Sequence, residues 1–247
     1  MSDLKNGLSR RRFLGAGTLI ALSSPLANAA TVTGGSGTPW TPDVASPPPK
    51  IDPNQWGFFN KKEKVMVDAL VETLIPADEL SPSGKDAGCT VFIDRQMAGR
   101  YGQGSRLYMN GPFGANPLPT QGRQTPLSPA EEFRRGLTSL QSYCTNKYKK
   151  AFADLPDQDR ESVLHGLESG KIIFQGEVSA AEFFKSLLAR TMEGFFADPV
   201  YGGNRDMVSW KMIGYPGARY DYLNWIERHN ETYPNPPVSI YGYTPES

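Results

Sequence analysis

Helical spacing of apolar residues dominates the chain from about residue 58 onward. The first run spaces its apolar positions at i, i+3, i+4 and i+7, as on one helix face: Val67, Leu70, Val71 and Leu74. We expect this helix to begin near Asn60, with Glu63 three positions on, and to stop at Pro76. A second and shorter helix is predicted by the stretch CTVFIDRQMAG, residues 89–99.

Two capping boxes predict the starts of two longer helices. In a capping box, serine and a glutamate three positions later each accept a hydrogen bond from a backbone N–H at the helix start. Ser128 precedes Pro129 and Glu131, and proline suits the first helical position. Ser179 and Glu182 form the other box. The apolar stripe behind the first box is Phe133, Leu137, Leu140, Cys144 and Tyr148. Behind the second box stand Phe183, Phe184, Leu187, Leu188 and Phe195.

The rest of the chain adds two further helices and a long irregular segment. A helix containing His165 is ended by Gly170, and a last short helix is expected at residues 220–228. Residues 100–127 form a loop, and loops of this length inside a compact domain are usually functional or bound by a partner. Alternating apolar runs are almost missing. We therefore predict a mainly α fold, an irregular helical bundle of about five to seven helices with long aromatic, Pro- and Gly-rich loops and extended terminal arms.

Four regions follow from the distribution of residue types. The 247 residues include 21 prolines and 25 glycines, which concentrate at the ends and in two internal stretches. We expect a signal peptide over residues 1–29 and a flexible Pro/Gly/Ser linker over 30–57. A single helical domain over 58–229 and a Pro- and Tyr-rich tail over 230–247 complete the chain.

The N-terminal region resembles a twin-arginine export signal. Arg10 and Arg11 stand at the arginine pair of that signal, an apolar run covers residues 14–22, and a small-x-small cleavage site ends at Ala29. A transmembrane anchor is the alternative, but it needs roughly 20 apolar residues and the run is far shorter. We therefore expect passage through the twin-arginine translocase, cleavage after Ala29 and a periplasmic mature protein. Because this pathway moves folded proteins, often with a cofactor inserted, the next question is which cofactor the chain could carry.

Charge and motifs argue against several classes of function. Lys+Arg and Asp+Glu number 26 each, and without the first 29 residues 22 basic and 25 acidic groups remain. No basic patch stands out, so nucleic-acid binding is not expected. The sequence lacks a C-x-x-C-H haem motif, a dinucleotide-binding G-x-G-x-x-G between a strand and a helix, a P-loop and an H-E-x-x-H pair. We expect no cofactor or metal in this chain.

Few residues offer catalytic chemistry. His165 and His229 are isolated in the sequence and are expected to be ordinary histidines, not metal ligands. Asp198 and Asp206 could do acid–base work only if folding brought them together. No catalytic residue is therefore assigned.

The chain has two cysteines, Cys89 and Cys144. Cysteines in an oxidising compartment usually pair, so a Cys89–Cys144 disulfide is the first expectation. Two buried thiols, or one cysteine bonded to a partner chain, are the alternatives.

Five stretches between residues 60 and 222 carry a family resemblance: LVETLIPADELSPSGKDAG, VFIDRQMAGRYG, YMNGPF, TPLSPAEEFRRGL and EGFFADPVYGGNRDMVSWKMIGYPGARYDY. The last, residues 193–222, is long and unusual enough to be highly specific. Together they resemble the gluconate 2-dehydrogenase subunit 3 family, the small (gamma) subunits of membrane-associated FAD-dependent sugar and sugar-acid dehydrogenases.

The resemblance implies a non-catalytic role. In that family a large flavoprotein with FAD oxidises the sugar or sugar acid, and a multihaem cytochrome c passes the electrons to quinone. The small subunit carries the twin-arginine signal that the large subunit generally lacks, which implies an escort role in export. Conversion of D-gluconate to 2-dehydro-D-gluconate is the default reaction. Ketogluconate, glucose, sorbitol and fructose stay open, because the partner determines the substrate.

Residues 193–222 form the candidate partner interface. Tyrosine, tryptophan, methionine and arginine are enriched where proteins meet. The stretch offers five such residues: Tyr201, Arg205, Trp210, Met212 and Tyr215. The alternative is that the stretch closes the protein's own core, and one segment can do both.

Two other classes of function compete with the subunit hypothesis. One is a self-sufficient periplasmic enzyme that uses Asp198 and Asp206. The other is a carbohydrate-binding module whose aromatic loops form a sugar site. Activity or tight sugar binding in the isolated chain would favour one of these two.

Overall fold

The structure, a computed structural model, describes three stretches of the chain: residues 55–114, 118–219 and 222–240. The predicted signal residues Arg10, Arg11 and Ala29 lie outside the described residues, as does most of the predicted linker. Within the described stretches the chain is mainly helical and has no β-strand, which confirms the predicted fold class.

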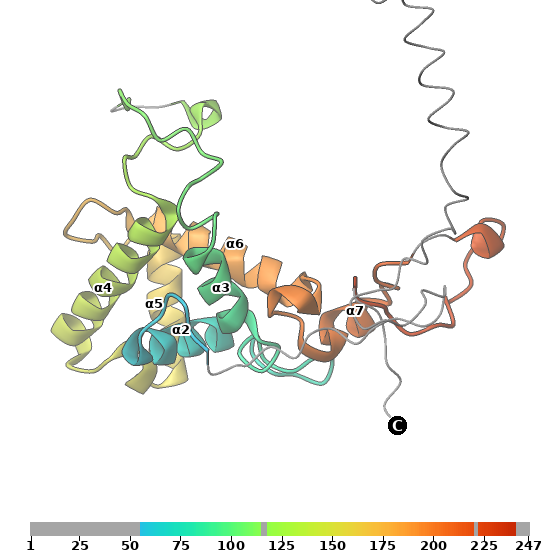
Figure 1. Cartoon of the computed structure of the whole chain (residues 1–247). Helices are drawn as coiled ribbons and strands as arrows, with labels where there is room; N and C mark the ends of the chain where they lie inside the picture. The colour runs from blue at the N-terminus through green and yellow to red at the C-terminus, as the bar shows by residue number, and fades with distance from the viewer. Residues whose placement is uncertain (1–54, 115–117, 220–221, 241–247) are drawn as a thin grey trace, which may run out of the picture. The chain divides into compact units, whose positions relative to one another are not determined.

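Six α-helices lie in the described residues, within the predicted range (Figure 1). They are α2 (Lys61–Leu74), α3 (Cys89–Ala98), α4 (Pro129–Tyr148), α5 (Asp157–Glu168), α6 (Ala180–Phe196) and α7 (Val208–Ile213). Short 3-10 turns lie at Pro119–Gln121, Phe152–Asp154, Pro199–Tyr201, Arg205–Met207 and Leu223–Trp225. The predicted long loop between α3 and α4 therefore contains one such turn.

Side-chain caps explain where the helices begin. Asn60 accepts hydrogen bonds from the first turn of α2, and the Glu63 carboxylate accepts one from the Asn60 N–H at 2.9 Å. A complete capping box also starts α4 at Ser128, as predicted. At α6 the Ser179 hydroxyl accepts from the Glu182 N–H at 3.5 Å, but the return bond of a full box is not formed. Such caps typically contribute about 1 kcal/mol each.

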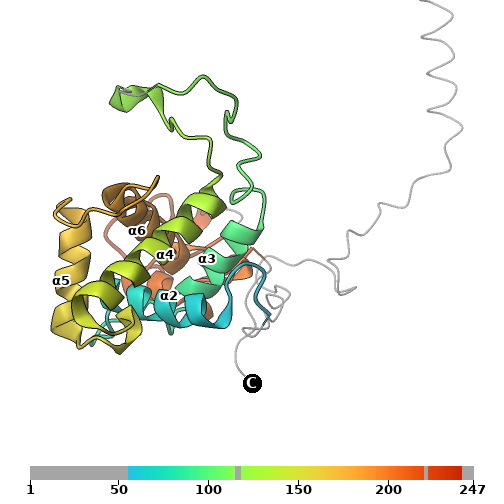
Figure 2. The same cartoon turned by 90° about the vertical axis from the view of Figure 1, so that its left-hand side faces the viewer.

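Helix α6 is the central helix, because it contacts the other five α-helices of the described residues. Each of α2 to α6 contributes a fully buried side chain to one core, for example Leu70, Ile93, Phe133, Leu167 and Phe183. Burial of side chains of this size contributes about 1.5–3 kcal/mol each. Figures 1 and 2 show α2, α3, α4 and α5 gathered near α6, and Figure 1 shows α6 leading toward α7.

A buried aspartate fixes the start of the folded unit. The Asp94 side chain on α3 is 2% exposed and accepts hydrogen bonds from the N–H groups of Gly57, Phe58 and Phe59 at 2.8, 2.9 and 2.7 Å. Arg134 on α4 adds a hydrogen bond to the Phe58 carbonyl and stacks its guanidinium 3.9 Å from the centre of the Phe58 ring. The predicted linker therefore ends bound against α3.

The last part of the chain differs from the prediction. The prediction of a short helix at residues 220–228 is wrong, because the described residues there form a single 3-10 turn, Leu223–Trp225. No side chain caps that turn. Helix α7 was not predicted, because six residues are too few to display a helical period.

Candidate partner-binding surface

The connection between α6 and α7 is packed closely against the rest of the fold. We call residues 197–207 the α6–α7 junction. A Cβ atom at Gly203 would lie 2.0 Å from the carbonyl oxygen of Gly194 on α6, so only glycine permits this approach. The Arg205 N–H donates to the carbonyl of Ala87 at 2.9 Å, which ties the junction to the residues before α3.

A buried asparagine organises the junction. Asn204 is fully buried, donates from Nδ2 to the Ala197 carbonyl at 2.9 Å, and accepts at Oδ1 from the Ser209 N–H and hydroxyl at 2.9 and 2.8 Å. Its φ is 44°, and Asp206 and Met207 also have positive φ, at 57° and 54°. Non-glycine residues rarely adopt this conformation, and such strain persists only where the surroundings hold it. The shape of the junction thus depends on its internal polar contacts.

Trp210, one of the predicted interface residues, is buried. Its indole Nε1 donates to the Phe196 carbonyl at 2.9 Å, and its ring lies edge-on to Tyr215 with centroids 5.1 Å apart. The side chain therefore packs α7 against the end of α6. For this residue the structure favours the alternative that the segment closes the protein's own core.

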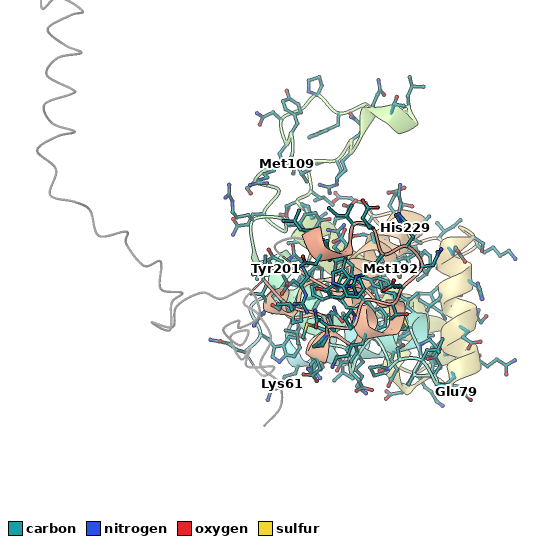
Figure 3. The ribbon with its side chains drawn as sticks, turned by 90° about the vertical axis from the view of Figure 1, so that its right-hand side faces the viewer. Lys61, Glu79, Met109, Met192, Tyr201 and His229 are labelled. Carbon is teal, nitrogen blue, oxygen red and sulfur yellow. The ribbon has the colours of Figure 1, made fainter. Side chains whose placement is uncertain are left out.

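The other predicted interface residues lie at the surface. Arg205 is exposed, and Tyr201, half of whose surface is accessible to solvent, lies with Met192 on the side seen in Figure 3. Seven exposed apolar side chains lie on α6, on α7 and in the segments next to α7. We call them the α6–α7 apolar face: Leu188, Met192, Phe196, Tyr201, Met212, Ile213 and Tyr215. Exposed apolar side chains on two elements that pack together, as α6 and α7 do, are a candidate interaction site.

Helix α6 is apolar on more than one side. Its core side contains the buried residues Phe183, Phe184, Leu187 and Phe195. Leu188, Met192 and Phe196, at i, i+4 and i+8, form a second apolar row that is partly exposed to solvent. Charged residues such as Lys185 and Glu193 occupy other positions of α6, so the second row is an apolar strip on a helix that also has polar positions. An exposed apolar strip of this kind is a candidate surface for a partner to cover.

The candidate acid–base pair has a different role. The Asp198 carboxylate accepts hydrogen bonds from the Val200 N–H at 3.0 Å, the Ser239 hydroxyl at 2.8 Å and the Ile240 N–H at 2.7 Å. None of these bonds involves Asp206, which is exposed. Asp198 therefore anchors the chain near residue 240 to the end of α6, which is a structural task.

The predicted disulfide is not formed, and both cysteines are free and buried. Cys89 opens α3 and Cys144 lies in the last part of α4, each inside the shared core. Burial raises the pKa of Cys89 to about 12 and that of Cys144 to about 11. Because the thiolate is the reactive form, both thiols are inert at neutral pH. Two buried thiols, the first alternative, describe the structure.

The histidines lie on the surface. His165 is exposed, with Nδ1 3.4 Å from the Glu168 carboxylate, and His229 is also exposed. In the described part of the chain, no three His, Cys, Asp or Glu side chains come together as metal ligands would. A hollow of about 610 Å³ along α5 includes His165, and another of about 340 Å³ is lined by residues 100–101 and 104–107. Among the described helices, none has the length and apolar character that a membrane span requires.

Comparison with known proteins identifies the family. The family model described as gluconate 2-dehydrogenase subunit 3 matches residues 61–217, well over half of the chain. The chain therefore belongs to the gluconate 2-dehydrogenase subunit 3 family, which confirms the resemblance found in the sequence. No curated protein and no solved structure matched the chain. Members of this family are subunits of a multi-subunit dehydrogenase, so family membership implies partner subunits for this chain.

Proposed function

We propose that this chain is the non-catalytic small subunit of a periplasmic, membrane-associated FAD-dependent dehydrogenase. In this proposal the large subunit holds FAD, a multihaem cytochrome c subunit holds haem c, and D-gluconate is the default substrate. The small subunit supports assembly of the flavoprotein and its export through the twin-arginine translocase. Family membership supports the role of a subunit.

The α6–α7 apolar face is the observation that carries the proposal. Five of its seven residues lie in the most specific block of the family resemblance, residues 193–222. In the same block Gly203, Asn204 and Trp210 are buried and hold the junction and α7 in place. Tyr201, Met212 and Tyr215 are left outward. A stable protein–protein interface needs a cluster of aromatic and apolar anchors of this kind.

The escort role rests on the N-terminal sequence. Arg10 and Arg11 resemble the twin-arginine pair, and the chain offers no motif for a cofactor of its own. A pathway for folded proteins is useful to such a chain if it carries a folded partner. The flavoprotein, which must fold around FAD before export, is that partner in our proposal.

Co-purification tests the subunit role. The chain is co-expressed with the FAD-containing large subunit, purified through a tag on the small chain, and examined by absorbance spectroscopy. We expect flavin absorbance to arrive with the wild type and to be lost when Met192→Asp places a charge on the α6–α7 apolar face. Ile173→Asp is the matched control, because Ile173 is 82% exposed but lies outside that face. A colourless small chain, with the large subunit in the unbound fraction, would refute the proposal.

Export is tested separately. Replacing the arginine pair by Arg10→Lys and Arg11→Lys should leave the large subunit in the cytoplasm, whereas Arg12→Lys should not. If the large subunit reaches the periplasm with the altered pair, the escort role fails while the subunit role stands. Gluconate oxidation by the isolated small chain would refute the non-catalytic assignment.

A further inference from the structure

The last described residues form a closed structure of their own. We call residues 216–219 and 222–240 the C-terminal arm. Its two ends meet at a bridge between Gly217 and Val238, where the Ala218 N–H donates to the Val238 carbonyl at 2.6 Å and the Val238 N–H donates to the Pro216 carbonyl at 3.2 Å. A Cβ at Gly217 would lie 2.2 Å from the Val238 carbonyl oxygen, and its φ is 78°, so glycine is required for this closure. The bridge lies where the family match ends, at residue 217.

Aromatic side chains stiffen the arm from within. The Tyr233 ring lies 5.8 Å from the Tyr222 ring and 5.2 Å from the Trp225 ring, both edge-on. Arg219 lies over Tyr233 and also donates to the Pro236 carbonyl. Edge-to-face aromatic pairs contribute about 0.5–1.5 kcal/mol beyond the area they bury. The arm is therefore pre-ordered.

Apolar side chains nevertheless point outward from the arm. Ile226 is 59% exposed, Leu223 is 72% exposed and Ile240 is 60% exposed. Internal order and outward apolar groups are the combination that binding requires, because a pre-ordered segment loses less conformational entropy when a partner covers it.

The root of the arm is continuous with the α6–α7 apolar face. Asp198, two residues after Phe196, holds the Ile240 N–H, and Tyr215 directly precedes Pro216. A partner seated on Phe196 and Tyr215 would thus also meet the root of the arm.

We propose that the C-terminal arm is a second docking element for the large flavoprotein subunit, with Ile226 entering an apolar depression on that partner. This inference rests on the proposed function and adds to it a contact outside the family-matched residues. Residues 216–240 contain two arginines and three acidic residues, so the arm lacks the basic excess that attracts anionic lipid headgroups. Continuity with the α6–α7 apolar face favours the partner of that face over a second copy of the chain.

Binding measurements with purified wild-type and variant chains and the FAD-loaded large subunit test the arm. Ile226→Asp should raise the dissociation constant about 30-fold, because a central apolar contact with the partner is lost. Ile173→Asp, the exposed control, should bind as the wild type does, and all chains should keep the same circular dichroism and melting temperature. If Ile226→Asp binds as the wild type does while Met192→Asp abolishes binding, the docking role of the arm is refuted and the proposed function stands. Failure of the wild type to bind would instead remove the proposed function itself.

Two further measurements distinguish other occupants. If the wild-type chain is a dimer by light scattering and Ile226→Asp makes it monomeric, the arm binds a second copy and the proposal is overturned. If the wild type floats with vesicles of anionic phospholipid and Ile226→Asp does not, a lipid surface is the occupant and the proposal is equally overturned.

The anchor at Asp198 gives an independent variant that leaves the outward side chains of the arm unchanged. Asp198→Asn weakens the hydrogen bonds that the Ser239 hydroxyl and the Ile240 N–H donate to this side chain, so amide hydrogen exchange in residues 222–240 should accelerate. Affinity for the large subunit should fall about tenfold, because the arm must then be ordered on binding. Faster exchange with unchanged affinity would show that the arm does not take part in docking.

Discussion

Removal of the Asp94 carboxylate should detach the start of the folded unit. Asp94 is 2% exposed and accepts three backbone N–H groups, from Gly57, Phe58 and Phe59, at 2.7–2.9 Å. A hydrogen bond to a charged group contributes about 1.5–3 kcal/mol, and the three are not additive because they share one acceptor group. Loss of all three leaves the N–H of the buried Phe59 unsatisfied and removes the partner of the less buried donors at Gly57 and Phe58, so Asp94→Ala should lower the free energy of unfolding by about 3–5 kcal/mol. Asp94→Asn keeps one acceptor oxygen and should lose about half as much.

Urea unfolding followed by circular dichroism measures this effect. With a slope of about 2 kcal/mol per molar, a loss of 3–5 kcal/mol moves the midpoint down by about 1.5–2.5 M. Glu161→Gln, which removes an exposed carboxylate on α5, is the matched control and should leave the midpoint within about 0.3 M. Amide hydrogen exchange should show loss of protection at residues 57–59 in Asp94→Ala.

Two outcomes would refute the explanation. A midpoint for Asp94→Ala close to that of the control would mean that the three hydrogen bonds contribute nothing net. A large loss of stability with residues 57–59 still protected would mean that Asp94 acts through some contact other than the N–H groups assigned here.

Further predictions concern the cysteines, the junction and the buried tryptophan. Cys89 and Cys144 should both resist an aromatic disulfide reagent in the native chain at pH 8 and should both react in denaturant without reductant, whereas no reaction would reveal a bridge. The pKa values of both thiols are raised in the folded chain, so the unfolded chain loses these protons at lower pH. The free energy of unfolding should therefore fall as pH rises from about 9 toward 11. The fall should be less steep in Cys89→Ala, which has one of the two thiols. Gly203→Ala should cost about 3 kcal/mol in urea unfolding, because its Cβ meets a backbone carbonyl; a loss under 1 kcal/mol would contradict that clash. Trp210→Ala should cost about 3–5 kcal/mol and Trp210→Phe about 1–2, and equal losses would assign the indole N–H no role.

The sequence was sufficient for the helices whose signals are local. The capping residues of α2 and α4 act within four positions of the helix start, and their apolar stripes extend over several turns. Helix α7 and the turn near residue 223 depend on contacts with distant segments, such as the Phe196 carbonyl for Trp210. A local pattern cannot contain that information, so these elements were missed or misassigned.

The same distinction applies to the candidate site. The composition of residues 193–222 indicated an interface, but it could not separate the inward Trp210 from the outward Tyr201 and Met212, because that depends on three-dimensional packing. Asp94 was missed, although a signal was present: it is the lone acidic residue of CTVFIDRQM and directly follows the apolar run Val91–Ile93. Leu188 and Met192 were also overlooked as surface residues, since their spacing resembles that of core positions.

The two aspartates that anchor the ends of the described chain have a practical consequence for shortened versions of this protein. A fragment cut to the matched residues 61–217 would retain both aspartates. It would discard all three main-chain donors of Asp94, at positions 57–59, and the Ile240 N–H that Asp198 holds besides that of Val200. Such a fragment would leave the Asp94 carboxylate without these three donors and would lose the link between the end of α6 and residue 240. Boundaries drawn from sequence similarity alone are therefore too tight for it, and expression trials should begin before residue 57 and end beyond residue 240.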